Sequence, residues 1–150
     1  MKIFLIAILS ILALSCNEAD DNSNSVTIES TLIAKDNLYG GGNEGIIEQN
    51  LVISDQATWD ALMTQMNSVN NVTNTFTETV IDFSEYKIIA VFDAIKANAG
   101  HSIELYITSN SESIFVNVTD LTPGGNAATV ITQPFHIVKI QATNLPIVFE

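Results

Sequence analysis

Apolar and polar residues alternate with a period of two along much of the chain after residue 25. Residues 102–108 show the alternation most clearly, and it resumes at residues 114–118 after the polar stretch 109–112. Successive side chains of a strand point to opposite faces of its sheet, and a short polar turn between two such runs predicts a β-hairpin. By the same reasoning we predict further strands at residues 26–34, 46–53, 80–83, 87–92, 129–133, 135–141 and 147–149.

Three departures from simple alternation add information. Ile33 is out of phase within the first predicted strand. Residues 87–92 are apolar on both faces, which is expected of a central strand that is buried on both sides. Pro134 has no N–H to donate to a strand ladder, so we expect it to mark an edge, a bulge or a corner between sheets.

Residues 54–67 follow a helical period instead. Apolar residues recur there at spacings of three and four, which forms one stripe along a helix: Trp59, Leu62, Met63 and Met66. Ser54 or Asp55 can cap the helix by accepting a hydrogen bond from a free backbone N–H group. The stripe predicts a helix that packs against a sheet.

These elements predict a mainly β (α+β) domain in residues 26–150. About eight mostly antiparallel strands form a small sandwich or a curled sheet, with one packed amphipathic helix. The glycines at positions 40–42 favour a solvent-exposed hairpin loop. A phosphate cradle is disfavoured because an extended stretch, rather than a helix, follows these glycines.

The N-terminus has the features of a lipoprotein signal peptide, predicted at residues 1–15. Lys2 precedes an apolar run of about 12 residues, which is too short for a membrane span of ~20 residues. Ala-Leu-Ser then precedes Cys16 and resembles a lipobox, so we expect Cys16 to be acylated and to anchor the chain in the outer membrane. An ordinary secretory signal with an incidental cysteine is the alternative.

Composition refines this picture. Residues 16–25 are polar and acidic, predict a flexible tether, and resemble the surface-export signal of Bacteroidetes-type lipoproteins; a spacer that faces the periplasm is the alternative. The chain has 17 acidic residues against 5 lysines and a net charge of −12, which becomes −13 once Lys2 is removed with the signal peptide. Such acidity excludes nucleic acid as a partner, because binding phosphates requires Lys and Arg.

Motifs for catalysis or cofactor binding are lacking in the sequence. Cys16 is the only cysteine, and the two histidines, His101 and His136, stand in no metal-binding or triad pattern. Adjacent His101 and Ser102 point to opposite faces of a strand, so they do not form a nucleophile–base pair. We therefore predict neither enzyme activity nor a cofactor, and calcium on the acidic surface stays an open alternative.

The C-terminal part resembles the C-terminal domain of the protease complex subunit PrcB family. Three stretches carry the resemblance in order: residues 80–92, Asn-Ala-Gly-His-Ser-Ile-Glu-Leu at 98–105, and Thr-Pro-Gly at 122–124 with Gln-Pro-Phe-His-Ile-Val-Lys at 133–139. His101 and Phe135 stand where the family has tyrosine. The resemblance implies a non-catalytic accessory module that associates with a cell-surface protease or another envelope protein.

Glycine-bearing loops and one proline corner are the candidate partner contacts, since loops carry function more often than strands do. They comprise Gly100, His101, Ser102, Pro123, Gly124, Gly125, Pro134, Phe135 and His136. The alternative is that these residues only shape turns. Two other functions stay open: a protease inhibitor, because residues 98–105 resemble the chagasin loop, and a hydrolase that uses carboxylates brought together by the fold.

Overall fold

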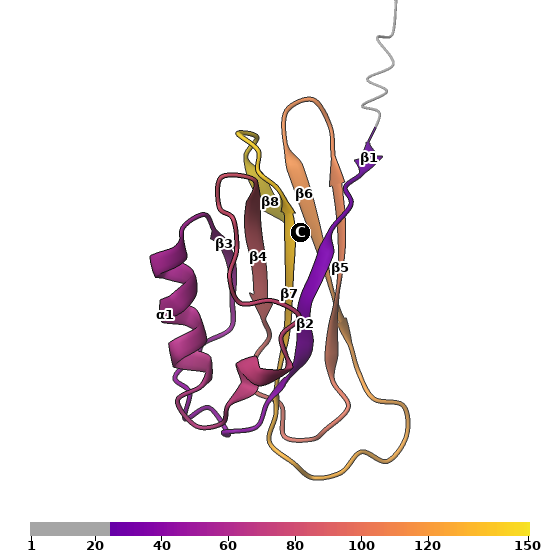
Figure 1. Cartoon of the computed structure of the whole chain (residues 1–150). Coiled ribbons are helices and arrows are strands. Elements are labelled where there is room, and N and C mark those ends of the chain that lie inside the picture. Colours follow the sequence, from indigo (N-terminus) through magenta and orange to yellow (C-terminus); the bar gives the residue numbers. More distant parts are fainter. Residues whose placement is uncertain (1–24) are drawn as a thin grey trace, which may run out of the picture.

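The computed structural model describes residues 25–150, in which two four-stranded sheets pack face to face and one helix covers the outer face of one sheet (Figure 1). The β5–β6 sheet has the strand order β1 (Val26–Thr27), β5 (Ser102–Ser109), β6 (Ile114–Leu121) and β8 (Ile147–Phe149). The β4–β7 sheet has the order β2 (Thr31–Leu38), β7 (Gln133–Gln141), β4 (Tyr86–Phe92) and β3 (Gln49–Ile53). All neighbours are antiparallel except β6 and β8. The prediction of a mainly β sandwich with one helix is confirmed.

The central strands β4 and β7 are buried on both faces, as predicted for β4. Ile88, Ala90 and Phe92 belong to the core beneath the helix, whereas Ile89 and Val91 belong to the core between the two sheets. The alternation of side chains along one strand therefore joins three layers.

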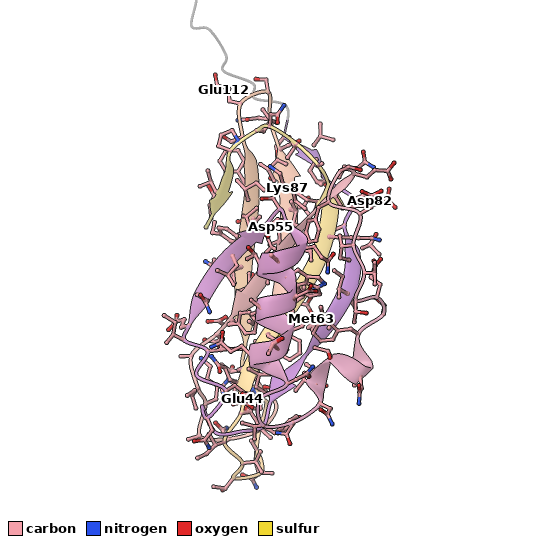
Figure 2. The ribbon with its side chains drawn as sticks, turned by 60° about the vertical axis from the view of Figure 1, so that its left-hand side comes forward. Glu44, Asp55, Met63, Asp82, Lys87 and Glu112 are labelled. Atoms are coloured by element: carbon pink, nitrogen blue, oxygen red, sulfur yellow. The ribbon has the colours of Figure 1, made fainter. Side chains whose placement is uncertain are left out.

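Helix α1 (Gln56–Met66) lies along the β4–β7 sheet, with Asp55 at one end and Glu44 beyond the other (Figure 2). Asp55 caps it by accepting a 2.8 Å hydrogen bond from the Thr58 N–H, and this bond and a second one from the Thr58 hydroxyl lower the pKa of Asp55. Trp59 is fully buried, donates its indole N–H to the Thr79 carbonyl at 2.9 Å and stacks on Phe76. The predicted cap and stripe are confirmed, with Met63 only half-buried.

The first predicted strand is divided between the two sheets. β1 pairs with β5, and after three residues β2 pairs with β7 in the other sheet. The register of β2 shifts between Leu32 and Ala34, and Ile33 and Ala34 are both buried. The out-of-phase Ile33 therefore marks a β-bulge, in which one extra residue locally turns two successive side chains inward.

Two predicted strands are wrong. Residues 80–83 form no strand, because Asp82 accepts hydrogen bonds from the Ser84 N–H and hydroxyl and turns the chain before β4. In residues 129–133, Thr132 makes only an isolated bridge with Lys96, and β7 begins at Gln133. A short 3-10 helix (Val72–Thr75) interrupts the predicted loop after α1.

The expected edge, bulge or corner at Pro134 is also wrong. Pro134 is the second residue of β7, a strand between β2 and β4. The sheet tolerates a proline here because β4 ends at Phe92 and therefore does not reach Pro134. The residue opposite Pro134 on that side is Asp93, whose N–H donates a hydrogen bond to the Pro134 carbonyl at 3.0 Å. The predicted signal peptide (residues 1–15), Cys16 and nearly all of the tether (residues 16–25) lie outside the described residues. Among residues 25–150, no helix has the length and apolar character that a membrane crossing requires.

Candidate functional site

Three connections meet at the end of the sandwich opposite β1 and the turn between β5 and β6 (Figure 1). We call this the loop end, and it consists of residues 39–48, 93–101 and 122–132. Backbone hydrogen bonds hold the second and third connections together: Lys96 N–H to the Thr132 carbonyl at 2.7 Å, the reverse bond at 3.0 Å, and Ala99 N–H to the Ala128 carbonyl at 2.9 Å. The loop end is thus fixed by the fold.

Two of the predicted contact stretches lie side by side at the loop end. Gly100 has φ +90°, and a Cβ placed on it would lie 2.9 Å from Cβ of Pro123. Gly124 and Gly125 would meet nothing within 4 Å, so they project into open space. The structure therefore brings Gly100 and Pro123 together, and it leaves the two glycines after Pro123 accessible.

His101 and Ser102 are half-buried at the start of β5. The Nε2 atom of His101 lies 3.1 Å from Oδ1 of Asn98. The backbone carbonyl of His101 accepts a hydrogen bond from the side-chain amide of Asn37 at 3.3 Å. These bonds join His101 to its own loop and to the end of β2.

Pro134, Phe135 and His136, predicted as contact residues, are buried in β7. Phe135 lies in the aromatic core beneath the helix. His136 places Nδ1 2.9 Å from the Ile103 carbonyl, and burial lowers its pKa, against the effect of that hydrogen bond. Because a carbonyl only accepts, Nδ1 carries the proton. Their burial does not fit a contact role, and we assign these three residues to the core.

Exposed isoleucines form an apolar surface at the loop end, which no local pattern in the sequence predicted. Ile47, Ile95 and Ile131 are 72%, 49% and 55% exposed, one from each connection. The glycine loop lies against two of them: Cβ atoms placed on Gly41 and Gly42 would lie 3.9 Å from Ile131 and 2.6 Å from Ile95. A hollow of about 350 Å³ between Gly42, Ile47 and Ile95 continues this surface.

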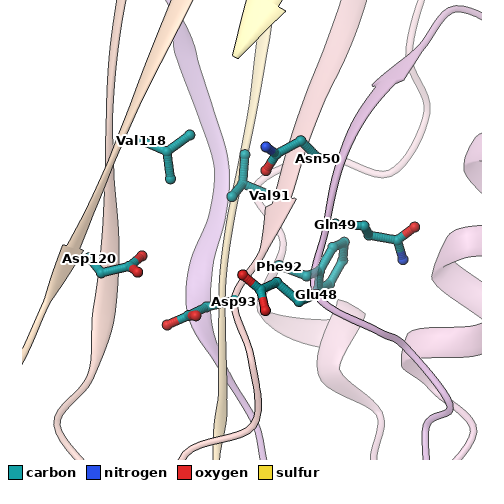
Figure 3. A pocket seen from close by; sticks show the side chains of 8 residues that line it. All are labelled: Glu48, Gln49, Asn50, Val91, Phe92, Asp93, Val118 and Asp120. Atoms are coloured by element: carbon teal, nitrogen blue, oxygen red, sulfur yellow. The ribbon is translucent and has the colours of Figure 1, made fainter. Parts of the chain in front are cut away.

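A second concave site, of about 320 Å³, opens between the two sheets on the side of β3 and β8 (Figure 3). We call it the acidic cleft. Its lining comes from β3 and the residue before it, from β4 and the residue after it, and from β6: Glu48, Gln49, Asn50, Val91, Phe92, Asp93, Val118 and Asp120. Three carboxylates thus face one hollow although they are far apart in the sequence.

Charge in the acidic cleft is only partly compensated. Asp93 is buried, accepts a hydrogen bond from the Ala94 N–H at 2.6 Å and forms an ion pair with Lys96 at 2.7 Å. Within residues 25–150, Glu48 and Asp120 form no ion pair. No three His, Cys, Asp or Glu side chains in that part of the chain are placed to hold a metal ion.

Comparison with known proteins gives no matching family model, no matching curated protein and no matching solved structure. The resemblance to the PrcB family therefore stays a prediction from the residues. The loop end and the acidic cleft are the two features of the described chain on which a functional argument can be based.

Proposed function

We propose that the chain is a non-catalytic protein-interaction module whose contact surface is the loop end. The observation that supports this proposal is the cluster of exposed isoleucines Ile47, Ile95 and Ile131 on three connections that meet there. Scattered apolar residues are normal on a protein surface, whereas apolar side chains gathered over a fixed hollow are typical of protein contact sites.

Backbone hydrogen bonds hold part of the loop end in place. Paired backbone hydrogen bonds between residues 96 and 132 hold two of the isoleucine-bearing connections. A surface held in place before binding loses little conformational entropy on binding. Gly124, Gly125 and Asn126, on the third connection of the loop end, are exposed to water.

The position of β1 shows where the loop end lies relative to the N-terminal segment. The described chain begins at the end of the sandwich opposite the loop end (Figure 1). If Cys16 carries the expected lipid anchor, the tether joins the domain at the end opposite the loop end. A surface protease, as the PrcB resemblance implies, or another envelope protein could then reach the loop end without displacing the tether.

Site-specific photo-crosslinking in intact cells tests the proposal. A crosslinking residue replaces Ile95 or Ile131 in the full-length chain, and Val80, which is 82% exposed on the connection between α1 and β4, is the matched control. We expect one discrete crosslinked product from positions 95 and 131 and none from position 80. Equal products from all three positions, or none from any, would contradict the loop end as the contact surface.

A fractionation experiment tests the anchor separately. Cys16→Ser removes the thiol that the lipid would modify. We expect the wild-type chain in the outer-membrane fraction and the variant outside that fraction. If Cys16→Ser reaches the outer membrane to the wild-type extent, the predicted lipid anchor is wrong, whatever the crosslinking shows.

A further inference from the structure

β6 extends beyond the strand that pairs with it on one side. β8 pairs with Ile114, Phe115 and Val116, and the Glu150 carbonyl accepts a last hydrogen bond from the Val118 N–H at 3.0 Å. The remainder of β6, up to Leu121, pairs with β5 on its other side. Within the described chain, no strand lies on the β8 side of this remainder.

The hydrogen bonds to β8 identify the backbone groups that point to the open side. The Ile114 and Val118 N–H groups and the Val116 carbonyl all bond toward β8 and Glu150. Because a strand directs its backbone groups to alternate sides, even-numbered residues of β6 face this edge. The Val118 carbonyl and both backbone groups of Asp120 therefore face the open edge, in line with β8.

This open edge is also the wall of the acidic cleft. Asp120 continues the inward-facing series Ile114, Val116 and Val118, so its carboxylate points toward the other sheet. Asp93 and Glu48 stand opposite it (Figure 3). A strand added along β6 would point every second side chain into this cleft.

The charges of the chain determine which side chains would fit. The four described lysines are already engaged: Lys35 with Glu104, Lys96 with Asp93, Lys139 with Glu78, and Lys87 with the Thr143 carbonyl. Asp120 and Glu48 are left without a cation among residues 25–150, in a chain of net charge −12. The complementary partner is cationic.

We propose that the acidic cleft binds an extended, lysine- or arginine-bearing segment of another protein as an added strand along β6, in line with β8. Its backbone donates to the Val118 carbonyl and accepts from the Asp120 N–H, and a basic side chain reaches the carboxylates of Asp120 and Glu48. Strand addition of this kind gains affinity from the main chain and specificity from alternate side chains. The cleft shares Glu48 and Asp93 with the loop end, but it opens on the side of the sandwich and is built on the edge of β6, so it goes beyond the loop-end contact.

Three capped seven-residue peptides test the proposal against full-length protein in detergent micelles. One alternates Thr and Lys, one alternates Thr and Glu, and one is the lysine peptide with N-methyl groups on the edge that would pair. Calorimetry measures the affinities, and amide NMR shifts locate the site. We expect the lysine peptide to bind at least about tenfold more tightly than either of the others, with the largest shifts at residues 118–121.

Two variants separate the site from the overall charge. Asp120→Asn should weaken binding of the lysine peptide by about tenfold, whereas Glu112→Gln, an equal loss of charge in the β5–β6 turn, should change it less than about twofold. Binding of the lysine and glutamate peptides alike, equal weakening by both variants, or no binding at millimolar peptide would overturn the proposal. Dimerisation of Asp120→Leu without peptide binding would instead assign Asp120 to guarding the edge against a second copy.

Discussion

The two faces of the β4–β7 sheet differ in how they are closed. On the helix side, four aromatic rings form a continuous series. The ring centroids of Trp59 and Phe76 are 5.9 Å apart, those of Phe76 and Phe135 are 6.3 Å apart, and those of Phe135 and Phe92 are 6.0 Å apart. On the side of the other sheet, the apolar residues Ile89 and Val91 give way at the loop end to polar groups. These polar groups are Asp93, Asp120 and His136.

This difference separates stability from binding within one small sandwich. Burying polar groups is unfavourable unless they are hydrogen-bonded, and both His136 and Asp93 have partners. Asp120 lies at the mouth of the cleft and forms no ion pair within the described chain. We infer that the helix side contributes most of the stability and that the sheet-to-sheet side retains chemistry for a partner.

The largest expected effect comes from opening the helix side. Trp59→Ala removes a fully buried ring and its hydrogen bond to Thr79, so the free energy of unfolding should fall by about 3–5 kcal/mol. Chemical denaturation measures it. Trp59→Phe, which keeps a ring against Phe76, should lose less; an equal loss would show that the aromatic packing contributes little.

A smaller effect is expected where the loop end closes the sheet-to-sheet side. Gly100→Ala forces a side chain onto a residue with φ +90° and against Pro123, so the free energy of unfolding should fall by more than about 1 kcal/mol. Gly124→Ala, which meets no atom within 4 Å, should change it by less than about 0.5 kcal/mol. Thermal unfolding of the two variants side by side distinguishes a structural glycine from an accessible one.

The polar groups of the sheet-to-sheet side should also make stability depend on pH. Burial, with Lys35 adding to it, lowers the pKa of His136 below its usual 6.5, while the Ile103 carbonyl and Glu104 oppose the shift. His136 therefore binds a proton more readily in the unfolded chain than in the folded chain, and the free energy of unfolding should fall as the pH drops below about 7. Denaturation of His136→Gln between pH 7 and 5 should lack this decline, and an unchanged pH profile would contradict the assignment.

The smallest expected effect is at the mouth of the cleft. Asp120→Leu removes an exposed carboxylate that forms no ion pair within residues 25–150. The free energy of unfolding should stay within about 0.5 kcal/mol of the wild type. A loss comparable to that of Gly100→Ala would mean that Asp120 serves the fold, and it would weaken the separation of stability from binding.

Local patterns in the sequence predicted much of the fold. The spacing of Trp59, Leu62 and Met66 predicted the helix, and clean alternation predicted the hairpin of β5 and β6. Local patterns failed where a side chain competes with the backbone, as Asp82 does by turning residues 80–83. The pattern also could not reveal that β8 pairs in parallel with β6, because pairing direction depends on the tertiary arrangement.

The candidate site was less predictable for a related reason. Pro123 and Gly100 were expected to matter, and the fold places them in contact. The acidic cleft was missed because Glu48, Asp93 and Asp120 come from three distant segments with no shared motif. A partial signal existed: Asp120 ends an inward-facing apolar series, which alternation alone can show.

The passage of the chain from β1 to β2 has a mechanical consequence. β1 holds only two residues to β5, whereas β2 pairs with β7 over its whole length and runs from the β1 end toward the loop end. A pull between the N-terminal segment and a partner held at the loop end acts along these strands. The hydrogen bonds of β2 with β7 lie across that direction, so they are loaded together in shear, and the domain should resist tension most strongly along the axis on which a membrane anchor would pull.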